Sequence, residues 1–323
     1  MAKLADAADL KSAGPKGLWG FDSPSRHQIA AGVYNPASEF NPATRFTRRS
    51  SLLPDVSYQS TRKMSWGEIC YYDRGKGPVV VLIHGMFGDF LDWEPVLEPL
   101  AASHRVIALD LPGFGGSSKP RREYSAEFFV SSLREFFQEL QLKEFSLAGN
   151  SFGGQIAMLY ALQHPESVSK LVLVNSGGFK KHTAEERALI EPRFSESVLA
   201  GLTPGIHAIL FSTVFAKTTE ASDRYLTKQN GKLRRSDYPA YAYALASSIR
   251  LSLTTYLVDR LPEIQCPTLL VWGERDQVLP VAQAELALTK LHAGELKAIP
   301  GCGHAPQLEC PAEFLRCVQP FLP

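Results

Sequence analysis

The sequence predicts an α/β fold with a mostly parallel, doubly wound sheet and a helical insertion. Residues 79–83 form a continuous, mostly β-branched apolar run, as in a strand covered on both faces. Similar runs alternate along the chain with amphipathic segments of helical spacing, an order typical of parallel sheets between helical layers. From residue 177 to about 262, helical segments follow one another without a strand pattern, which predicts the insertion.

Length and composition indicate a globular protein without a specialised surface for nucleic acid or membrane. The chain has 323 residues, enough for one large α/β domain with an insertion or for two domains. Hydrophobic residues make up 45% and charged residues 21%, and the net charge of +1 provides no basic surface. No apolar run is long enough to span a bilayer. Five cysteines without a framework pattern predict free thiols in a reducing, cytoplasmic compartment, and the oligomeric state is left open.

Residues 1–55 differ from the rest of the chain, and we predict no chemistry for them. Their prolines and other turn residues occur without periodicity, which is typical of a disordered extension. Early acidic residues and the lack of an apolar segment argue against a secretory or mitochondrial leader. Residues 1–27 also resemble a conceptual translation that runs through a transfer-RNA gene. A natural disordered tail and a start assigned too far upstream are both open interpretations.

The elements of the core are predicted in chain order from residue 56 onward. Turn residues near Gly67 separate the first two strands, and the helix at 125–140 shows apolar residues at helical spacing. The predicted strands are 57–66, 68–73, 79–83, 105–109, 145–148, 171–174, 268–272 and 295–299. The predicted core helices are 93–101, 125–140, 155–163 and 311–321.

The predicted organisation is a core, residues 56–176 and 263–323, interrupted by a helical cap at residues 177–262. Helices within the cap are predicted at 183–190, 205–215 and 238–257. We expect the cap to cover the carboxyl ends of the strands, where ligands bind in doubly wound sheets. The alternative, that these helices continue the doubly wound layer, is disfavoured because no strands lie between them.

The segment Gly149-Asn150-Ser151-Phe152-Gly153 joins a predicted buried strand to a predicted helix. A sharp turn of this kind holds its central residue in a strained conformation and brings neighbouring backbone very close, so glycine is needed on both sides. The turn would lift the Ser151 hydroxyl above the sheet edge, beside a helix N-terminus that favours negative charge. The same residues also suit an ordinary strand-to-helix loop, so the interpretation depends on partners elsewhere in the chain.

A serine nucleophile needs a base within hydrogen-bond reach and an acid that orients the base. Of the eight histidines, only His84 and His304 lie in glycine-rich loops after predicted strands. The loop containing His304 is flexible enough to place an imidazole over Ser151. Asp276 follows the strand at 268–272 and is the preferred acid, with Glu274 as the alternative.

These motifs, in this order, resemble the α/β-hydrolase superfamily over residues 56–323. The matching segments are His84-Gly85, Asp110-Leu111-Pro112-Gly113-Phe114-Gly115, Gly149-Asn150-Ser151-Phe152-Gly153-Gly154, Gly273-Glu274-Arg275-Asp276 and Gly303-His304.

The resemblance implies a role for each matching residue. Ser151 would be the nucleophile, His304 the base and Asp276 the orienting acid, while the backbone N–H groups of Met86 and Phe152 would form the oxyanion hole.

The resemblance also implies that His84 supports the oxyanion loop and that Asp110 is a hydrogen-bonding turn residue. Cys302, His304 and Cys310 match no common zinc spacing, so we expect no metal, and the predicted mechanism needs no cofactor.

Aromatic residues are candidates for the wall of an apolar substrate pocket. Phe87 directly follows Met86, and Phe211 and Tyr241 come from the predicted cap. Packing in the hydrophobic core is the default role for each of them.

The expected reaction is hydrolysis of a carboxylic ester on a small-molecule substrate of small to medium size. The chain also resembles hydrolases that cleave carbon–carbon bonds in aromatic ring-fission products, which often carry Gly-Asn-Ser-Phe-Gly-Gly. Those enzymes usually have Ser-Gly-Pro-Gly after the His-Gly pair, whereas this chain has Met86-Phe87-Gly88-Asp89. Acyl transfer to another acceptor and a role as a triad-bearing ligand receptor are further alternatives.

Overall fold

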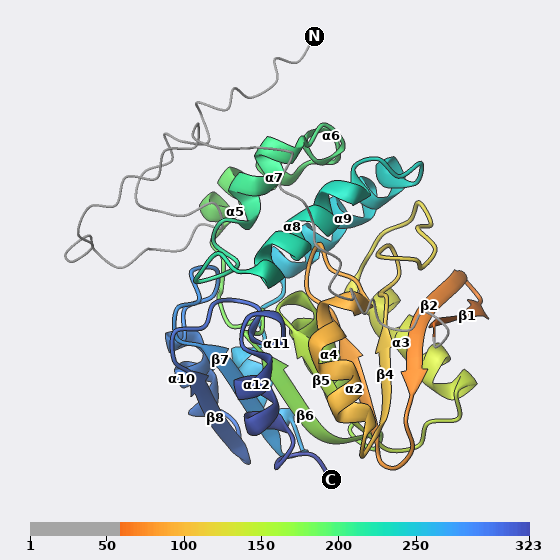
Figure 1. Ribbon diagram of the computed structural model, residues 1–323, viewed down its shortest axis with the longest axis vertical. Coiled ribbons are helices and arrows are strands. Elements are labelled where there is room, and N and C mark those ends of the chain that lie inside the picture. Colours follow the sequence, from red (N-terminus) through yellow and green to blue (C-terminus); the bar gives the residue numbers. More distant parts are fainter. Residues whose placement is uncertain (1–58) are drawn as a thin grey trace, which may run out of the picture.

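Figure 1 shows the computed structural model of the chain, which describes residues 59–323. Its centre is an eight-stranded sheet in the order β1-β2-β4-β3-β5-β6-β7-β8. The strands from β4 to β8 pair in parallel, while β1 and β2 add an antiparallel edge. The prediction of a mostly parallel, doubly wound sheet is confirmed. The prediction for residues 1–55 falls outside the described residues.

The strands agree with the predicted segments to within a few residues. The largest difference is β6, which begins three residues before the predicted position. The strands are β1 (Gln59–Met64), β2 (Gly67–Arg74), β3 (Val79–Ile83), β4 (Arg105–Leu109), β5 (Phe145–Asn150), β6 (Val168–Val174), β7 (Thr268–Gly273) and β8 (Gly294–Ile299).

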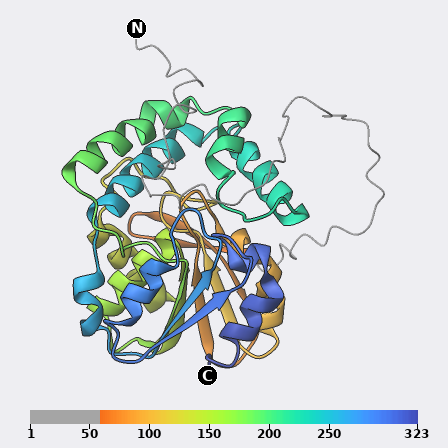
Figure 2. The same cartoon turned by 90° about the vertical axis from the view of Figure 1, so that its left-hand side faces the viewer.

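Helices cover both faces of the sheet (Figure 2). Alternate residues of β3 enter two different cores: Val81 and Ile83 join α3 and α4, whereas Val80 and Leu82 join α2 and α12. This explains the continuous apolar run, because both faces of the strand are buried. The core helices are α2 (Glu94–Ala101), α3 (Ala126–Glu139), α4 (Phe152–Gln163), α10 (Ala282–Leu288), α11 (Pro306–Glu309) and α12 (Pro311–Val318).

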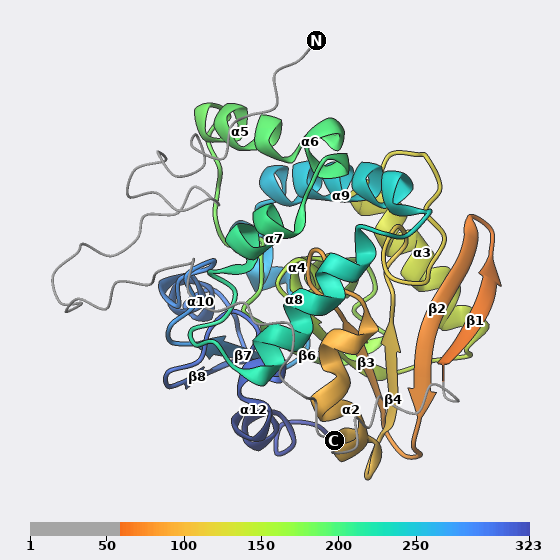
Figure 3. The same cartoon turned by 45° about the horizontal axis from the view of Figure 1, so that its top comes forward.

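The segment between β6 and β7, which we call the insertion, lies over one end of the sheet (Figure 3). The predicted cap, residues 177–262, falls within this segment. Helices α5, α7 and α9 of the insertion match predicted segments, whereas α6 and α8 were not predicted. Helix α8 begins after Thr219, whose hydroxyl accepts a hydrogen bond from the Ser222 N–H at 3.2 Å. The helices are α5 (Ala184–Ile190), α6 (Glu196–Ala200), α7 (Pro204–Phe211), α8 (Glu220–Lys232) and α9 (Tyr238–Thr254).

We expect Phe136→Ala to lower the free energy of unfolding by about 3–5 kcal/mol, because it leaves a cavity between α3 and the sheet. Phe136 is fully buried and meets Tyr71 of β2 edge-to-face, with ring centroids 5.0 Å apart. The control is Gln138→Ala, at an exposed position of the same helix, for which we expect a change within about 0.5 kcal/mol. Urea unfolding measures both, and equal losses would contradict the packing described.

Candidate active site

Ser151 lies on a strained turn between β5 and α4, with φ 54° and ψ −117°. A Cβ atom on Gly149 would lie 2.3 Å from the carbonyl oxygen of Gly153, and one on Gly153 would lie 2.4 Å from that of His84. Glycine is therefore required on both sides of the serine, as the sequence predicted. Helix α4 begins at Phe152, immediately after the turn, which is three residues earlier than predicted.

His304 and Asp276 form a buried hydrogen-bonded pair. The Nδ1 atom of His304 lies 2.8 Å from Oδ2 of Asp276. The other carboxylate oxygen, Oδ1, accepts hydrogen bonds from the N–H groups of Val278 at 2.7 Å and Leu279 at 2.9 Å. With an acceptor at Nδ1, the neutral imidazole carries its proton there and leaves Nε2 as an acceptor.

Asn175 and Asn150 hold this pair against the Ser151 turn. The Nδ2 group of Asn175 donates to Oδ2 of Asp276 at 2.5 Å. The Nδ2 group of Asn150, next to Ser151, donates to the carbonyl oxygen of His304 at 3.2 Å. Asn175 was not among the residues predicted for the site.

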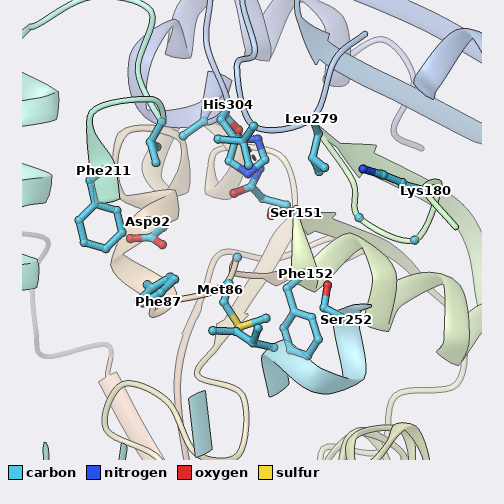
Figure 4. Close-up of a pocket in the computed structure, with 18 of the residues that line it drawn as sticks. Met86, Phe87, Asp92, Ser151, Phe152, Lys180, Phe211, Ser252, Leu279 and His304 are labelled. Carbon is cyan, nitrogen blue, oxygen red and sulfur yellow. Dashed lines mark hydrogen bonds between the residues drawn. The ribbon is translucent and has the colours of Figure 1, made fainter. Parts of the chain in front are cut away.

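Ser151 and His304 line the same cavity, and Figure 4 shows their side chains facing each other there. The structure thus brings together the predicted nucleophile, base and acid. Glu274, the alternative acid, is exposed.

The predicted oxyanion donors, Met86 and Phe152, also line this cavity. Phe152 is the first residue of α4, so its N–H has no acceptor within the helix. Met86 lies in the loop that follows β3, and the neighbouring Gly85 approaches the serine closely. A Cβ atom on Gly85 would lie 3.3 Å from Cβ of Ser151.

His84 supports the loop after β3, as the resemblance implied. Its Nδ1 lies 2.7 Å from the carbonyl oxygen of Gly85, and its Nε2 accepts a hydrogen bond from the N–H of Leu111 at 3.0 Å. This arrangement requires a neutral ring. Burial lowers the pKa of His84 to about 4, in agreement with that requirement.

Asp110 is buried and binds backbone, not the histidine of the pair. Its carboxylate accepts hydrogen bonds from the N–H groups of Phe90 at 2.7 Å and Gly116 at 2.6 Å. Burial and the charge of Asp89 raise its pKa. Asp110 thus joins the turn after β4 to the segment after the oxyanion loop.

The cavity has a volume of about 1060 Å³, including the part open to solvent, and its wall is mostly apolar. Phe87 and Phe211 form one side, with ring centroids 5.3 Å apart. Tyr241 lies outside the cavity wall and packs against Phe114 at 5.9 Å, because α9 turns that side chain toward the core. The polar side chains at the wall, besides those of the Ser151 region, are Asp92, Lys180, His182, Tyr225, Ser252, Gln283 and Gln307.

Four charges beside the cavity, which we call the charge network, were not predicted from the sequence: Asp89, Asp92, Lys228 and Lys232. Lys228 is half-buried and the other three are buried. Asp89 is the last residue of the oxyanion loop, residues 84–89, and Asp92 lies just after it, while the two lysines belong to α8. Lys228 Nζ lies 2.9 Å from Asp89 Oδ1 and also contacts Asp92, while Lys232 Nζ lies 3.1 Å from Asp89 Oδ2. The four-residue spacing of the lysines was the available signal.

Within residues 59–323, no cluster of three or more His, Cys, Asp or Glu side chains could hold a metal ion. The five cysteines are free thiols. None of the helices in this range is both long and apolar enough to cross a membrane.

The chain is similar to a protein family, to named relatives and to solved structures. A family model described as alpha/beta hydrolase fold matches residues 78–311. The 2-hydroxy-6-oxo-6-(2'-aminophenyl)hexa-2,4-dienoic acid hydrolase of Metapseudomonas resinovorans is 30% identical over 260 residues, covering 79% of this chain and 87% of that protein. The pimeloyl-(acyl-carrier protein) methyl ester esterase of Nitrosomonas europaea is 30% identical over 247 residues, covering 75% and 95%. The crystal structure of a membrane phospholipase A has 32% identity and a TM-score of 0.69, covering 81% and 84%.

We expect His84 to make stability depend on pH. Its pKa is about 4 in the folded protein against an ordinary value of 6.5, so the unfolded chain binds the proton more readily. The stabilisation is complete above pH 6.5 and is lost as the pH falls toward 4, by about 3 kcal/mol. Chemical unfolding at successive pH values measures it. His84→Gln keeps an acceptor for Leu111 without titrating, so equal slopes in parent and variant would contradict this assignment.

Proposed function

The chain belongs to the alpha/beta hydrolase fold family, and from that premise we propose that it is a serine hydrolase of carboxylic esters. The observation that carries this proposal is the buried Asp276–His304 hydrogen bond, at 2.8 Å, at the cavity lined by the strained Ser151 turn. A histidine oriented by a carboxylate beside a raised serine is the arrangement that activates a hydroxyl group. The methyl ester esterase among its relatives supports an ester substrate.

In the proposed mechanism, Oγ of Ser151 attacks the ester carbonyl carbon while Nε2 of His304 takes the hydroxyl proton. Asp276 holds the Nδ1–H and stabilises the imidazolium that forms. The N–H groups of Met86 and Phe152 donate to the oxygen that becomes negative, where one such donor contributes about 3 kcal/mol. His304 then protonates the departing alcohol, and a water molecule activated by the same histidine releases the acid from Ser151.

The cavity supports a small to medium, largely apolar substrate, with Phe87 and Phe211 against its acyl or alcohol part. The insertion acts as a cap that shields the site from bulk water, and the mechanism uses no cofactor. Free cysteines support a reducing, cytoplasmic setting.

A second candidate is hydrolysis of a carbon–carbon bond in a dienoic ring-fission product. Lys180 lines the cavity on the side opposite Phe211 (Figure 4), and His182 also lines it. Basic side chains there suit a substrate carboxylate, although Lys180 pairs with Glu186 at 3.0 Å. The relative from Metapseudomonas resinovorans is named for such a substrate.

Comparing kcat/KM for short and long p-nitrophenyl esters with kcat/KM for a dienoic ring-fission product decides between ester hydrolysis and carbon–carbon bond hydrolysis.

We expect Ser151→Ala to abolish ester hydrolysis and covalent labelling by a fluorophosphonate, because the variant lacks the hydroxyl that the proposed base His304 activates. Ser252→Ala is the matched control, since Ser252 lines the same cavity, and it should keep both activities. Mass spectrometry of the labelled peptide identifies the modified residue. Hydrolysis by Ser151→Ala at the parental rate would contradict the nucleophile assignment.

Asp276→Asn should lower kcat by roughly 10⁴, because an amide in place of the carboxylate favours the wrong imidazole tautomer. Glu274→Gln makes the same chemical change two residues earlier, at an exposed position, and should leave kcat unchanged. Steady-state kinetics on the best ester compares the two variants. Similar losses in both, or loss only in Glu274→Gln, would show that the acid had been misassigned.

A further inference from the structure

The charge network connects helix α8 to the oxyanion loop. Lys232 ends α8, and its ammonium group donates to the carbonyl oxygens of Phe87 at 2.5 Å and Gly88 at 3.4 Å. It also lies 3.1 Å from Oδ2 of Asp89. An ammonium group has three N–H donors, and three consecutive residues of the loop supply acceptors for them. The first of these residues follows Met86 directly.

Phe87 has a backbone conformation that needs support from its surroundings. Its φ is 64°, in the left-handed region where a bulky residue is strained. Such a conformation persists only where neighbouring groups fix it. The Lys232 ammonium group is bound to the carbonyl oxygen of this strained residue, and the Phe87 ring packs against Phe211.

Lys232 and Asp89 form a buried pair of opposite charges. Lys232 is 8% exposed and Asp89 is 7% exposed, so both charges have left water. Burial would raise the pKa of Asp89, but the Lys232 and Lys228 ammonium groups hold it well below its ordinary value. A buried charge that loses its partner is costly, whereas apolar side chains could pack α8 at lower cost. The charge network therefore favours one arrangement of α8 against the oxyanion loop.

The same part of the insertion also holds the histidine loop. The N–H of His304 donates to the carbonyl oxygen of Val214 at 2.7 Å. The carboxylate of Glu309 accepts hydrogen bonds from Gly303 N–H at 2.6 Å and from Ala216 N–H at 3.0 Å. The segment that leads into α8 therefore contacts the loop of the base, while the end of α8 contacts the oxyanion loop.

We propose that Lys232 is a positioning residue of the catalytic centre. Its ammonium group holds the oxyanion loop so that the Met86 N–H points at the developing negative charge. This inference rests on the proposed hydrolase function and assigns part of that function to the insertion. It follows that the insertion does more than enclose the substrate.

The test compares Lys232→Met with Arg224→Met, which removes a cation from the same helix at an exposed pair with Glu220. A third variant, Asp89→Asn with Lys232→Met, removes one charge of each sign and so leaves the charge network balanced, with Lys228 against Asp92. Asparagine at position 89 can still accept the N–H of Leu91, as Asp89 does. Complete fluorophosphonate labelling counts the folded sites in each preparation.

For Lys232→Met and for the double variant, we expect kcat per labelled site to fall about 10- to 100-fold with KM unchanged. Affinity for a trifluoromethyl ketone, which forms an oxyanion on Ser151, should fall by a similar factor. Arg224→Met should match the parent in both measurements.

If the double variant recovered both the kcat and the stability of the parent, the inference would be overturned. Lys232 would then act only by balancing the charge of Asp89. Parental kcat and ketone affinity in Lys232→Met would also overturn it. Both results leave the proposed function intact. A parent protein that is neither labelled nor active on esters contradicts the proposed function itself.

Discussion

The strained backbone of Ser151 is the constraint to which the surrounding elements are fitted. A non-glycine residue in this region costs of order 1–3 kcal/mol, so the neighbouring structure must fix it. The N–H of Ser151 donates to Val174 of β6 at 2.9 Å, and its carbonyl oxygen accepts from Gly154 at 3.1 Å and Gly177 at 2.9 Å. The central sheet, helix α4 and the start of the insertion therefore meet at one residue. This fixation supports its proposed role as the nucleophile.

Two groups of charges near Ser151 are internally paired. Asp276 is bound by His304, Asn175 and two backbone N–H groups. The charge network balances two aspartates with two lysines. The cavity that Asp92 and His304 help to line has a mostly apolar wall. In such surroundings backbone dipoles act strongly on a charge that develops during reaction.

The sequence predicts those structural features that depend on a local residue pattern or on a motif. Glycines around Ser151 predicted the strained turn, and the buried run at 79–83 predicted a central strand. The charge network was not predictable in this way. Helix α8 has no apolar stripe, so its lysines look like solvated charges until the fold brings Asp89, 139 positions before Lys228, against them. Tyr241 shows the same limit, because its side chain is directed by helix packing and not by its neighbours in sequence.

A crystal structure of the protein after reaction with a fluorophosphonate tests the central claim most directly. We expect a covalent bond between phosphorus and Oγ of Ser151. We also expect a phosphonyl oxygen about 2.7–3.1 Å from the backbone nitrogens of both Met86 and Phe152. Phosphorus bound to another residue, or a phosphonyl oxygen turned away from both N–H groups, would contradict it.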